Sequence, residues 1–261
     1  MMNIISSQLF LTLVSAIFIT AITGYLGTLM LSKKMSIVAD PLSHLTLPGA
    51  ALAIIYGYSL FLGVFPFVIL GTILIWLIQK RTKLPMENVA AVVFAIAVSS
   101  ALLILPIDKA EEILIGNITK ITVPETLITI ILSLVVFYRV RKIYPKMMLI
   151  NIYEDLAMIE GVNISLYNLL YLLSIAIVLG LGVYLVGGFI TAALIAIPAA
   201  SAKNLSTNLF SYKIMSIVFG VISAVAGIFL ARFVHLPTGP MVIATGVILF
   251  LISIIFQRRT V

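Results

Sequence analysis

Nine stretches of this 261-residue chain are rich enough in apolar residues to lie inside a lipid bilayer. A membrane-spanning helix needs roughly 20 mostly apolar residues to cross about 30 Å of hydrocarbon, and only the fifth and seventh stretches are short for that. The chain is therefore predicted to form a single polytopic membrane domain. The stretches cover approximately residues 8–31, 35–57, 59–79, 86–106, 123–138, 165–186, 188–203, 213–233 and 239–256.

The composition agrees with a membrane protein and excludes other classes. Hydrophobic residues make up 62% of the chain and charged residues only 10%, whereas soluble domains are about 45–50% apolar and about 25% charged. A soluble protein, a disordered chain and a nucleic-acid binder are therefore excluded. Because cysteine is absent, the chain forms no disulfides and has no thiolate metal site or cysteine nucleophile.

Basic residues are concentrated in alternate gaps between the apolar stretches. Of 16 Lys and Arg residues, 13 fall on one side, and only Lys109, Lys120 and Arg232 fall on the other. Cytoplasmic loops of membrane proteins carry an excess of Lys and Arg. This asymmetry predicts an extracytoplasmic N-terminus and a cytoplasmic C-terminus, in agreement with an odd number of spans. The 13 residues are Lys33, Lys34, Lys80, Arg81, Lys83, Arg139, Arg141, Lys142, Lys146, Lys203, Lys213, Arg258 and Arg259.

Two of the gaps are long enough to hold structure of their own. The outer gap, residues 107–122, is expected to form a short interfacial helix. In the inner gap, residues 139–163, Pro145 is expected to interrupt any helix. The residues from Glu154 to Glu160 then read as a short helix ended by Gly161, a residue type common at helix C-caps. This cytoplasmic helix is either a plain surface element or a contact for a partner protein.

Two ionisable residues, Asp40 and His44, lie inside the second predicted span. Asp40 is the only acidic residue well inside a span, and His44 shares its helix face because it follows four residues later. A carboxylate with an imidazole suits zinc, manganese or iron. Pro41 and Pro48 lack an N–H, which releases the carbonyl groups of Ile37 and His44. Freed carbonyl groups at membrane depth are tolerated only where they are buried or line a wet cavity.

The Asp40–His44 pair has two interpretations. In the first, the two side chains merely satisfy each other inside the bundle; in the second, they carry metal transport or a proton relay. A charged residue inside a membrane costs at least about 2.5 kcal/mol, which favours the functional interpretation. The other histidine, His235, lies in an outer loop and is either an ordinary surface residue or part of a route by which metal reaches the membrane.

Several catalytic motifs are missing from the sequence. It contains no P-loop, no Gly-x-Gly-x-x-Gly, no His-Glu-x-x-His and no Gly-x-Ser-x-Gly. An intramembrane enzyme is therefore not supported, and the chain is not expected to bind ATP through a P-loop.

Four segments, taken in order, resemble a known family. They are ADPLSHLTLPGA at 39–50, AEEILIG at 110–116, GGFITAALIAIPAASA at 187–202 and LPTGP at 236–240. This order of elements is similar to the signatures of permeases in the zinc, manganese and iron ABC importer family, often called ABC-3. The resemblance runs from about residue 8 to 256. It departs from the family pattern at Ile115, where Phe is usual, and at His235, where Asp is common.

The resemblance implies a fold, a function and a set of partners. The fold would be an all-α membrane bundle of about 8–9 transmembrane helices, similar to the permease of the vitamin B12 importer type. The chain would work as a homodimer in a prokaryotic cytoplasmic membrane, together with cytoplasmic ABC ATPase subunits and an extracytoplasmic metal-binding protein. It would hold no permanent cofactor, because the divalent metal is the transported substrate.

The resemblance also implies roles for particular residues. Asp40 and His44 match the positions that the family uses for metal in the translocation path. The segment EDLAMIEG at 154–161, inside a cytoplasmic segment covering about 145–163, is similar to the family's coupling helix, which docks into the ATPase. The residues expected to contribute to coupling are Glu154, Asp155, Ala157 and Gly161.

Two other functions compete with an ABC permease. A transporter driven by an ion gradient would use Asp40 and His44 as proton and substrate groups, and it should show embedded acids in more than one span; this chain has one. A membrane scaffold without transport activity would leave the pair without a purpose. Because one Asp and one His suit zinc, manganese and iron alike, the residues do not select the metal.

Overall fold

The computed structural model describes the backbone of residues 2–32, 36–105, 121–186 and 191–257. Side chains are described within these ranges, except at residues 2–7, 36–37 and 184–186. Most of the expected outer helix at 107–122 and all of the segment at 110–116 therefore lie outside the described residues. The same holds for Gly187 to Ile190 and for Lys33, Lys34, Lys109, Lys120, Arg258 and Arg259.

The described residues form helices joined by short connections, with no strand among them. This confirms the predicted all-α membrane bundle. The helices are α1 (Met2–Ser32), α2 (Ser36–His44), α3 (Thr46–Tyr56), α4 (Leu60–Thr82), α5 (Met86–Ile104), α7 (Val123–Ile152), α8 (Glu154–Ile159), α9 (Ile164–Val186), α10 (Thr191–Leu205), α11 (Leu209–Val234) and α12 (Thr238–Ile255).

Eight candidate membrane spans lie within the described residues, one fewer than the nine apolar stretches. The difference is the seventh stretch, which corresponds to the 15-residue helix α10. At 1.5 Å per residue α10 is about 22 Å long, shorter than the roughly 30 Å of hydrocarbon, and residues 187–190 directly before it lie outside the described ranges. The fifth stretch is longer than expected, because α7 has 30 residues.

Helix α7 also corrects the expectation that Pro145 interrupts the helical structure of the inner gap. The helix passes through Pro145 and ends at Ile152. Pro145 is exposed, whereas Tyr144 and Met147 on either side of it are buried in the core. Packing of that buried face holds the helix together, and the carbonyl that loses its N–H partner belongs to exposed Arg141, where water can satisfy it.

Local capping sets the start of two long helices. The Thr122 hydroxyl accepts a hydrogen bond from the Glu125 N–H, and the Glu125 carboxylate accepts one from the Thr122 N–H at 2.8 Å. This reciprocal capping box begins α7. The Asn208 side-chain oxygen accepts a hydrogen bond from the Ser211 N–H at 2.8 Å and begins α11 in a similar way.

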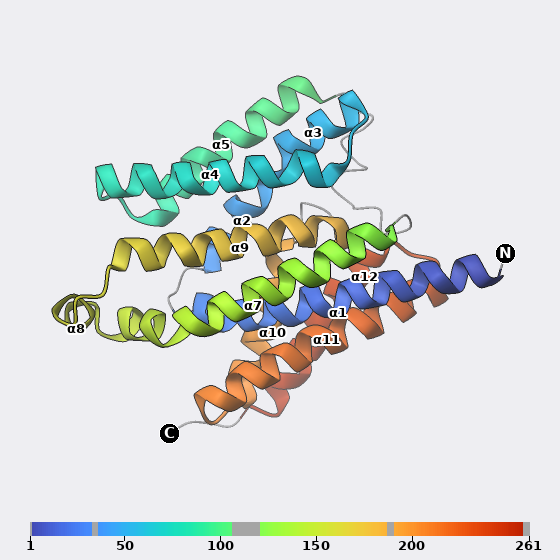
Figure 1. Cartoon of the computed structure of the whole chain (residues 1–261). Coiled ribbons are helices and arrows are strands. Elements are labelled where there is room, and N and C mark those ends of the chain that lie inside the picture. Colours follow the sequence, from blue (N-terminus) through green and yellow to red (C-terminus); the bar gives the residue numbers. More distant parts are fainter. Residues whose placement is uncertain (1, 33–35, 106–120, 187–190, 258–261) are drawn as a thin grey trace.

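The helices are arranged around α1. Helix α1 packs against α7, α9, α10 and α11, while α3, α4 and α5 form a separate layer beyond α9 (Figure 1). The short helix α2 contacts α5 and α9 and so joins the two parts. This position places the residues of α2 between helices that come from distant parts of the sequence.

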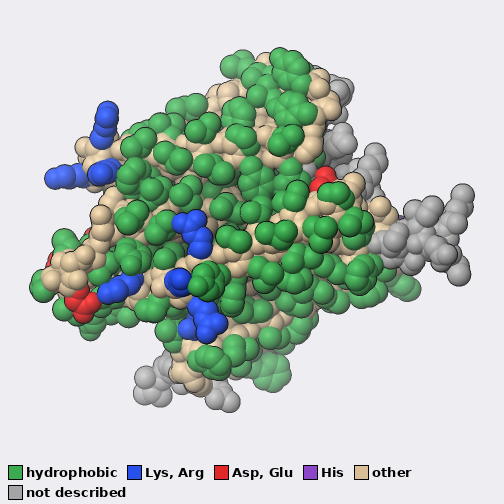
Figure 2. Space-filling view, in the orientation of Figure 1, with side chains coloured by type: hydrophobic (Ala, Val, Ile, Leu, Met, Phe, Trp, Pro, Cys, Tyr) green, Lys and Arg blue, Asp and Glu red, His purple; other side chains and the backbone are tan. Residues whose placement is uncertain are grey.

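The start of α1 and the end of α12 lie at opposite ends of the bundle (Figure 1). Eight crossings alone would bring both termini to the same end, so the segment that contains α10 must also lead from one end of the bundle to the other. In Figure 2, Lys and Arg side chains gather toward the end of the bundle that carries α8. That end therefore has the charge expected of a cytoplasmic face.

Candidate functional site: a broken span with an Asp–His pair

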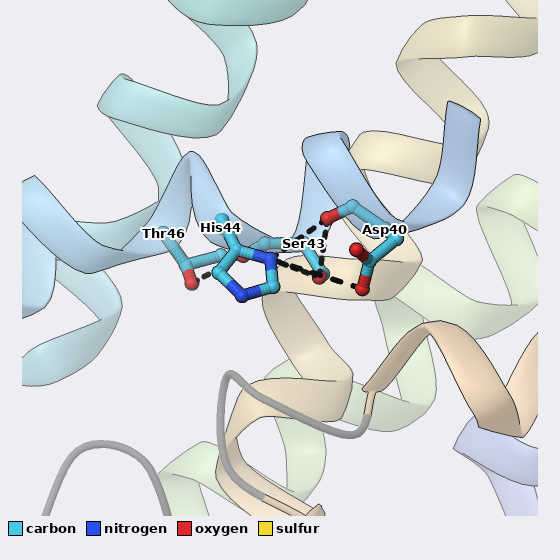
Figure 3. Close-up of polar contacts among 4 residues, drawn as sticks. All are labelled: Asp40, Ser43, His44 and Thr46. Carbon is cyan, nitrogen blue, oxygen red and sulfur yellow. Dashed lines mark hydrogen bonds and ion pairs between the residues drawn. The ribbon is translucent and has the colours of Figure 1, made fainter. Parts of the chain in front are cut away.

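The second predicted span is interrupted at its centre. Helix α2 ends at His44 and α3 begins at Thr46, with Leu45 between them. Pro48 is the third residue of α3, so it cannot donate to the His44 carbonyl four residues back. Side-chain hydroxyls satisfy neighbouring carbonyl groups, because Ser43 donates to the Asp40 carbonyl at 2.7 Å and Thr46 donates to the Ser43 carbonyl at 2.6 Å (Figure 3). The break is therefore built into the sequence.

The break positions the His44 ring beside Asp40. The Nδ1 atom of His44 lies 2.9 Å from the Asp40 carbonyl oxygen, 3.2 Å from the Ser43 hydroxyl and 3.9 Å from an Asp40 carboxylate oxygen. Since a carbonyl oxygen only accepts hydrogen bonds, the short contact places the imidazole proton on Nδ1. In that tautomer the lone pair lies on Nε2, the nitrogen that a metal ion would bind.

Burial differs sharply between the two residues. The His44 residue is 7% exposed and meets the Phe94 ring of α5 edge-on, with 5.0 Å between ring centroids. The Asp40 side chain is 62% exposed. The structure therefore holds the imidazole in a fixed orientation while the carboxylate faces outward from the single chain. Phe94 was not foreseen from the sequence, because nothing in its local pattern links it to the pair.

Asp40 is the fifth residue of α2, and His44 is its last. The described residues contain no group of three or more His, Cys, Asp and Glu side chains that could hold a metal ion. One chain thus brings two side chains of the types that bind metal ions together at this place.

The other histidine occupies a different part of the molecule. His235 ends α11 in the left-handed backbone conformation, with φ of 60°, and it is exposed. Helix α2 contacts α5, α9 and α10 rather than packing closely on α11. The fold therefore does not bring His235 together with the Asp40–His44 pair.

Helix α8 forms as the sequence predicts. It covers Glu154–Ile159, and Gly161 follows with φ of 72°. The Gly161 N–H donates to the Met158 carbonyl at 3.0 Å, and the Val162 N–H donates to the Ala157 carbonyl at 2.9 Å. These two bonds form a Schellman motif, which ends the helix and turns the chain toward α9.

The surface of α8 is apolar on its outer side. Met158 is 54% exposed and Ile159 is 82% exposed, whereas Ala157 is fully buried against the bundle. Glu154 and Asp155 form the first turn, where negative charge interacts favourably with the helix dipole. An apolar surface beside a charged turn is suited to docking against another protein.

Comparisons with known proteins agree over nearly the whole chain. The profile of the ABC 3 transport family matches residues 6–257. The zinc uptake membrane protein ZnuB of Buchnera aphidicola subsp. Baizongia pistaciae is 27% identical over 246 residues, covering 92% of this chain and 94% of that protein. The manganese import permease ScaB of Streptococcus parasanguinis is 26% identical over 245 residues, covering 92% and 88%.

Two solved structures have the same fold. PsaBC of Streptococcus pneumoniae in complex with a Fab superposes with a TM-score of 0.80 at 24% identity, over 93% of this chain and 89% of that chain. An inward-facing ABC transporter of the metal-chelate type superposes with a TM-score of 0.75 at 17% identity, over 94% and 85%. The match of the family profile to residues 6–257 shows that the chain belongs to the ABC 3 transport family.

Proposed function

We propose that this chain is the membrane-spanning permease subunit of an ABC importer that carries a divalent transition metal into the cytoplasm. The observation that carries the proposal is an Asp–His pair at a break in a membrane span, in a chain whose family match covers residues 6–257. Relatives named for zinc and for manganese transport both match. The transported ion is therefore proposed as zinc, manganese or iron, which share a preference for these ligands.

The metal pathway is proposed to pass Asp40 and His44. One chain offers two ligands there, and tetrahedral zinc takes four. A symmetric homodimer in which both copies of α2 face the axis would supply four ligands without any cysteine. The high exposure of the Asp40 side chain in the single chain supports this arrangement. His235, at the other end of the bundle, is proposed to belong to the route by which metal reaches the pathway.

Energy for transport is proposed to come from separate ATPase subunits. The sequence has no P-loop, and α8 presents Met158 and Ile159 outward at the end of the bundle where basic side chains gather. Glu154, Asp155, Ala157 and Gly161 are proposed to couple this helix to the ATPase. An extracytoplasmic metal-binding protein is proposed to deliver the ion to the opposite end.

We also propose an orientation in the prokaryotic cytoplasmic membrane. The end of the bundle carrying α8 would face the cytoplasm, which places the N-terminus outside and the C-terminus inside. A transporter driven by an ion gradient is disfavoured by the family membership.

Metal uptake in cells that express the whole system tests the metal site. Asp40→Asn keeps the side-chain shape and removes the charge, while His44→Ala removes a nitrogen ligand, so both variants should lose uptake. His235→Ala, at the opposite end of the bundle, should retain it at saturating metal. Membrane levels and ATPase assembly of each variant are measured in parallel. Uptake at the unmodified rate in either Asp40→Asn or His44→Ala would mean that the pair is structural.

A further inference from the structure

Helix α7 carries basic residues on its side rather than at its end. Arg139, Arg141 and Lys142 are all exposed, and the helix continues for several turns after them. At 1.5 Å per residue, Arg141 lies about 27 Å along the axis from Val123, where α7 begins, and about 16 Å of helix follows it. Since the hydrocarbon is about 30 Å thick, a helix that starts at one boundary of the hydrocarbon places these cations at the level of the opposite lipid headgroups.

The exposed face of α7 that leads to these cations is apolar. Its members follow one another at intervals of three or four residues, so they form one stripe along the helix, and Arg141 and Lys142 continue that stripe. A surface that is first apolar and then basic matches a phospholipid, in which acyl chains are joined to a charged headgroup. The apolar stripe consists of Leu127, Ile131, Leu134 and Tyr138.

A fourth cation approaches α7 from the start of α11. The Lys213 ammonium lies 4.5 Å from the centre of the Tyr144 ring, and Tyr144 is three residues from Arg141, a neighbouring position on the helix surface. The Lys142 ammonium likewise lies 4.5 Å from the centre of the Tyr138 ring. Because aromatic rings attract cations, the two rings restrict where these lysines lie. The four cations, called the basic row below, are Arg139, Arg141, Lys142 and Lys213.

The positive charge of the basic row is not balanced by carboxylates. Lys146, one turn further along α7, pairs with Glu160 at 3.6 Å. Within the described part of the chain, no member of the basic row forms an ion pair. Figure 2 shows Lys and Arg side chains in a row across the bundle where α7 runs, with apolar side chains around them. Neighbouring positive charges beside an apolar surface favour an anionic group that carries apolar chains.

The packing of α7 leaves this face open to lipid. Helix α7 packs against α1 and α9, whereas α2 packs mainly against α5, α9 and α10. A homodimer whose axis lies beside Asp40 on α2 would therefore not cover the outer side of α7. A soluble partner would have to cover the apolar stripe at the depth of the hydrocarbon, where acyl chains already satisfy it.

We propose that the basic row binds the headgroup of an anionic phospholipid and that the apolar stripe of α7 contacts its acyl chains. Arg and Lys side chains donate charge-assisted hydrogen bonds to phosphate oxygens, and the exposed Tyr138 hydroxyl lies where the stripe meets the row. Basic clusters beside membrane-spanning helices attract anionic headgroups in this way. The lipid site is independent of the proposed transport function.

Native mass spectrometry of the purified full-length protein counts bound lipid molecules directly. The protein is titrated with phosphatidylglycerol, which is anionic, or with phosphatidylcholine of the same acyl chains, which has no net charge. We expect the first phosphatidylglycerol to bind at least tenfold more tightly than phosphatidylcholine, and we expect this preference to fall as the ionic strength rises. Equal affinity for the two lipids would overturn the proposal.

Variants of the basic row locate the bound headgroup. Lys213→Gln should weaken phosphatidylglycerol binding by about fivefold, the contribution of one cation near an anionic surface. The combined variant Arg139→Gln, Arg141→Gln and Lys142→Gln should lose the preference for phosphatidylglycerol. Neither change should alter phosphatidylcholine binding, because that lipid has no net charge. Thermal stability of each variant is measured in parallel, and Lys213→Gln tests the site even where the combined variant does not fold.

A matched control removes the same number of cations elsewhere. Lys80, Arg81 and Lys83 lie at the end of α4, and replacing all three by Gln should leave the preference for phosphatidylglycerol unchanged. Loss of the preference in this control would show that net charge alone attracts the lipid, and it would overturn a site at the basic row.

Three other results would also overturn the lipid site. The first is an unchanged preference in both Lys213→Gln and the combined α7 variant. The second is displacement of phosphatidylglycerol by millimolar inorganic phosphate, which would make the basic row a site for free anions. The third is a combined α7 variant that keeps its lipid preference but no longer co-purifies with the ATPase, which would make the row a protein-docking surface. Metal uptake enters none of these results, so they are distinct from the test of the metal pathway.

Discussion

Gly161 offers a sharp test of the coupling role of α8. It has φ of 72°, and a Cβ atom added to it would meet nothing within 4 Å. Gly161→Ala therefore introduces backbone strain without a steric clash. A left-handed conformation costs an L-residue roughly 1–2 kcal/mol, which corresponds to about a 5- to 30-fold change in a local equilibrium. Helix α8 has six residues, so little of its own structure can offset this loss.

Gly57 is a matched control at the end of α3. It also has φ of 72° and open space around its missing Cβ. Gly57→Ala therefore imposes the same kind of backbone strain, but at the C-terminal end of α3 and not at α8. Both variants should fold and reach the membrane. Only Gly161→Ala should reduce the ATP hydrolysis that the metal-loaded binding protein stimulates, by about 5- to 30-fold if the Schellman motif must stay intact.

The measurement is ATP hydrolysis by the purified complex in proteoliposomes, together with its thermal stability. Gly161→Asn provides a rescue, because Asn tolerates the left-handed region better than Ala; it should retain more stimulated activity than Gly161→Ala. Equal stimulated activity in Gly161→Ala and Gly57→Ala would refute the reasoning that the end of α8 transmits the coupling.

Two further predictions concern packing and orientation. A Cβ at Gly49 would overlap the Gly63 carbonyl of α4, whereas a Cβ at Gly180 would lie 3.4 Å from the Phe65 ring, an ordinary contact distance. Gly49→Ala should therefore reduce the stability of the folded protein by about 1–3 kcal/mol and lower the temperature at which the purified protein aggregates. Gly180→Ala should leave that temperature unchanged. Because the chain has no cysteine, Lys142→Cys should be shielded from an impermeant thiol reagent in intact cells and His235→Cys should react. Labelling of Lys142→Cys from outside would reverse the proposed orientation.

Hydropathy and helix-ending residues predict much of this fold. Long apolar runs identify eight of the spans because the hydrocarbon requires about 20 apolar residues. The Glu154–Ile159 helix followed by Gly161 was also foreseen, because a left-handed C-cap favours glycine wherever it occurs. These are local properties that a single segment encodes.

Features that depend on packing were not predictable in the same way. Pro145 was expected to break its segment, yet α7 continues because the buried face around Tyr144 and Met147 packs against the core. Nothing in the local pattern links Phe94 to His44, whose ring it meets edge-on with 5.0 Å between ring centroids. Residues so far apart in sequence meet only once the helices have packed.

The exposure of Asp40 leads to a last prediction about where its side chain lies in the assembled protein. In the single chain the Asp40 side chain is 62% exposed, much like Leu70 at 65% on α4. A carboxylate facing hydrocarbon would cost at least about 2.5 kcal/mol, whereas a leucine there costs nothing. Asp40 should therefore face a water-filled path between two copies, and Leu70 should face lipid. Asp40→Cys should react rapidly with a small charged thiol reagent in the purified complex, and Leu70→Cys should react far more slowly, because a thiol in hydrocarbon neither ionises nor meets the reagent. Equal, slow reaction at both positions would place Asp40 away from water and remove the physical basis for a metal path at this break.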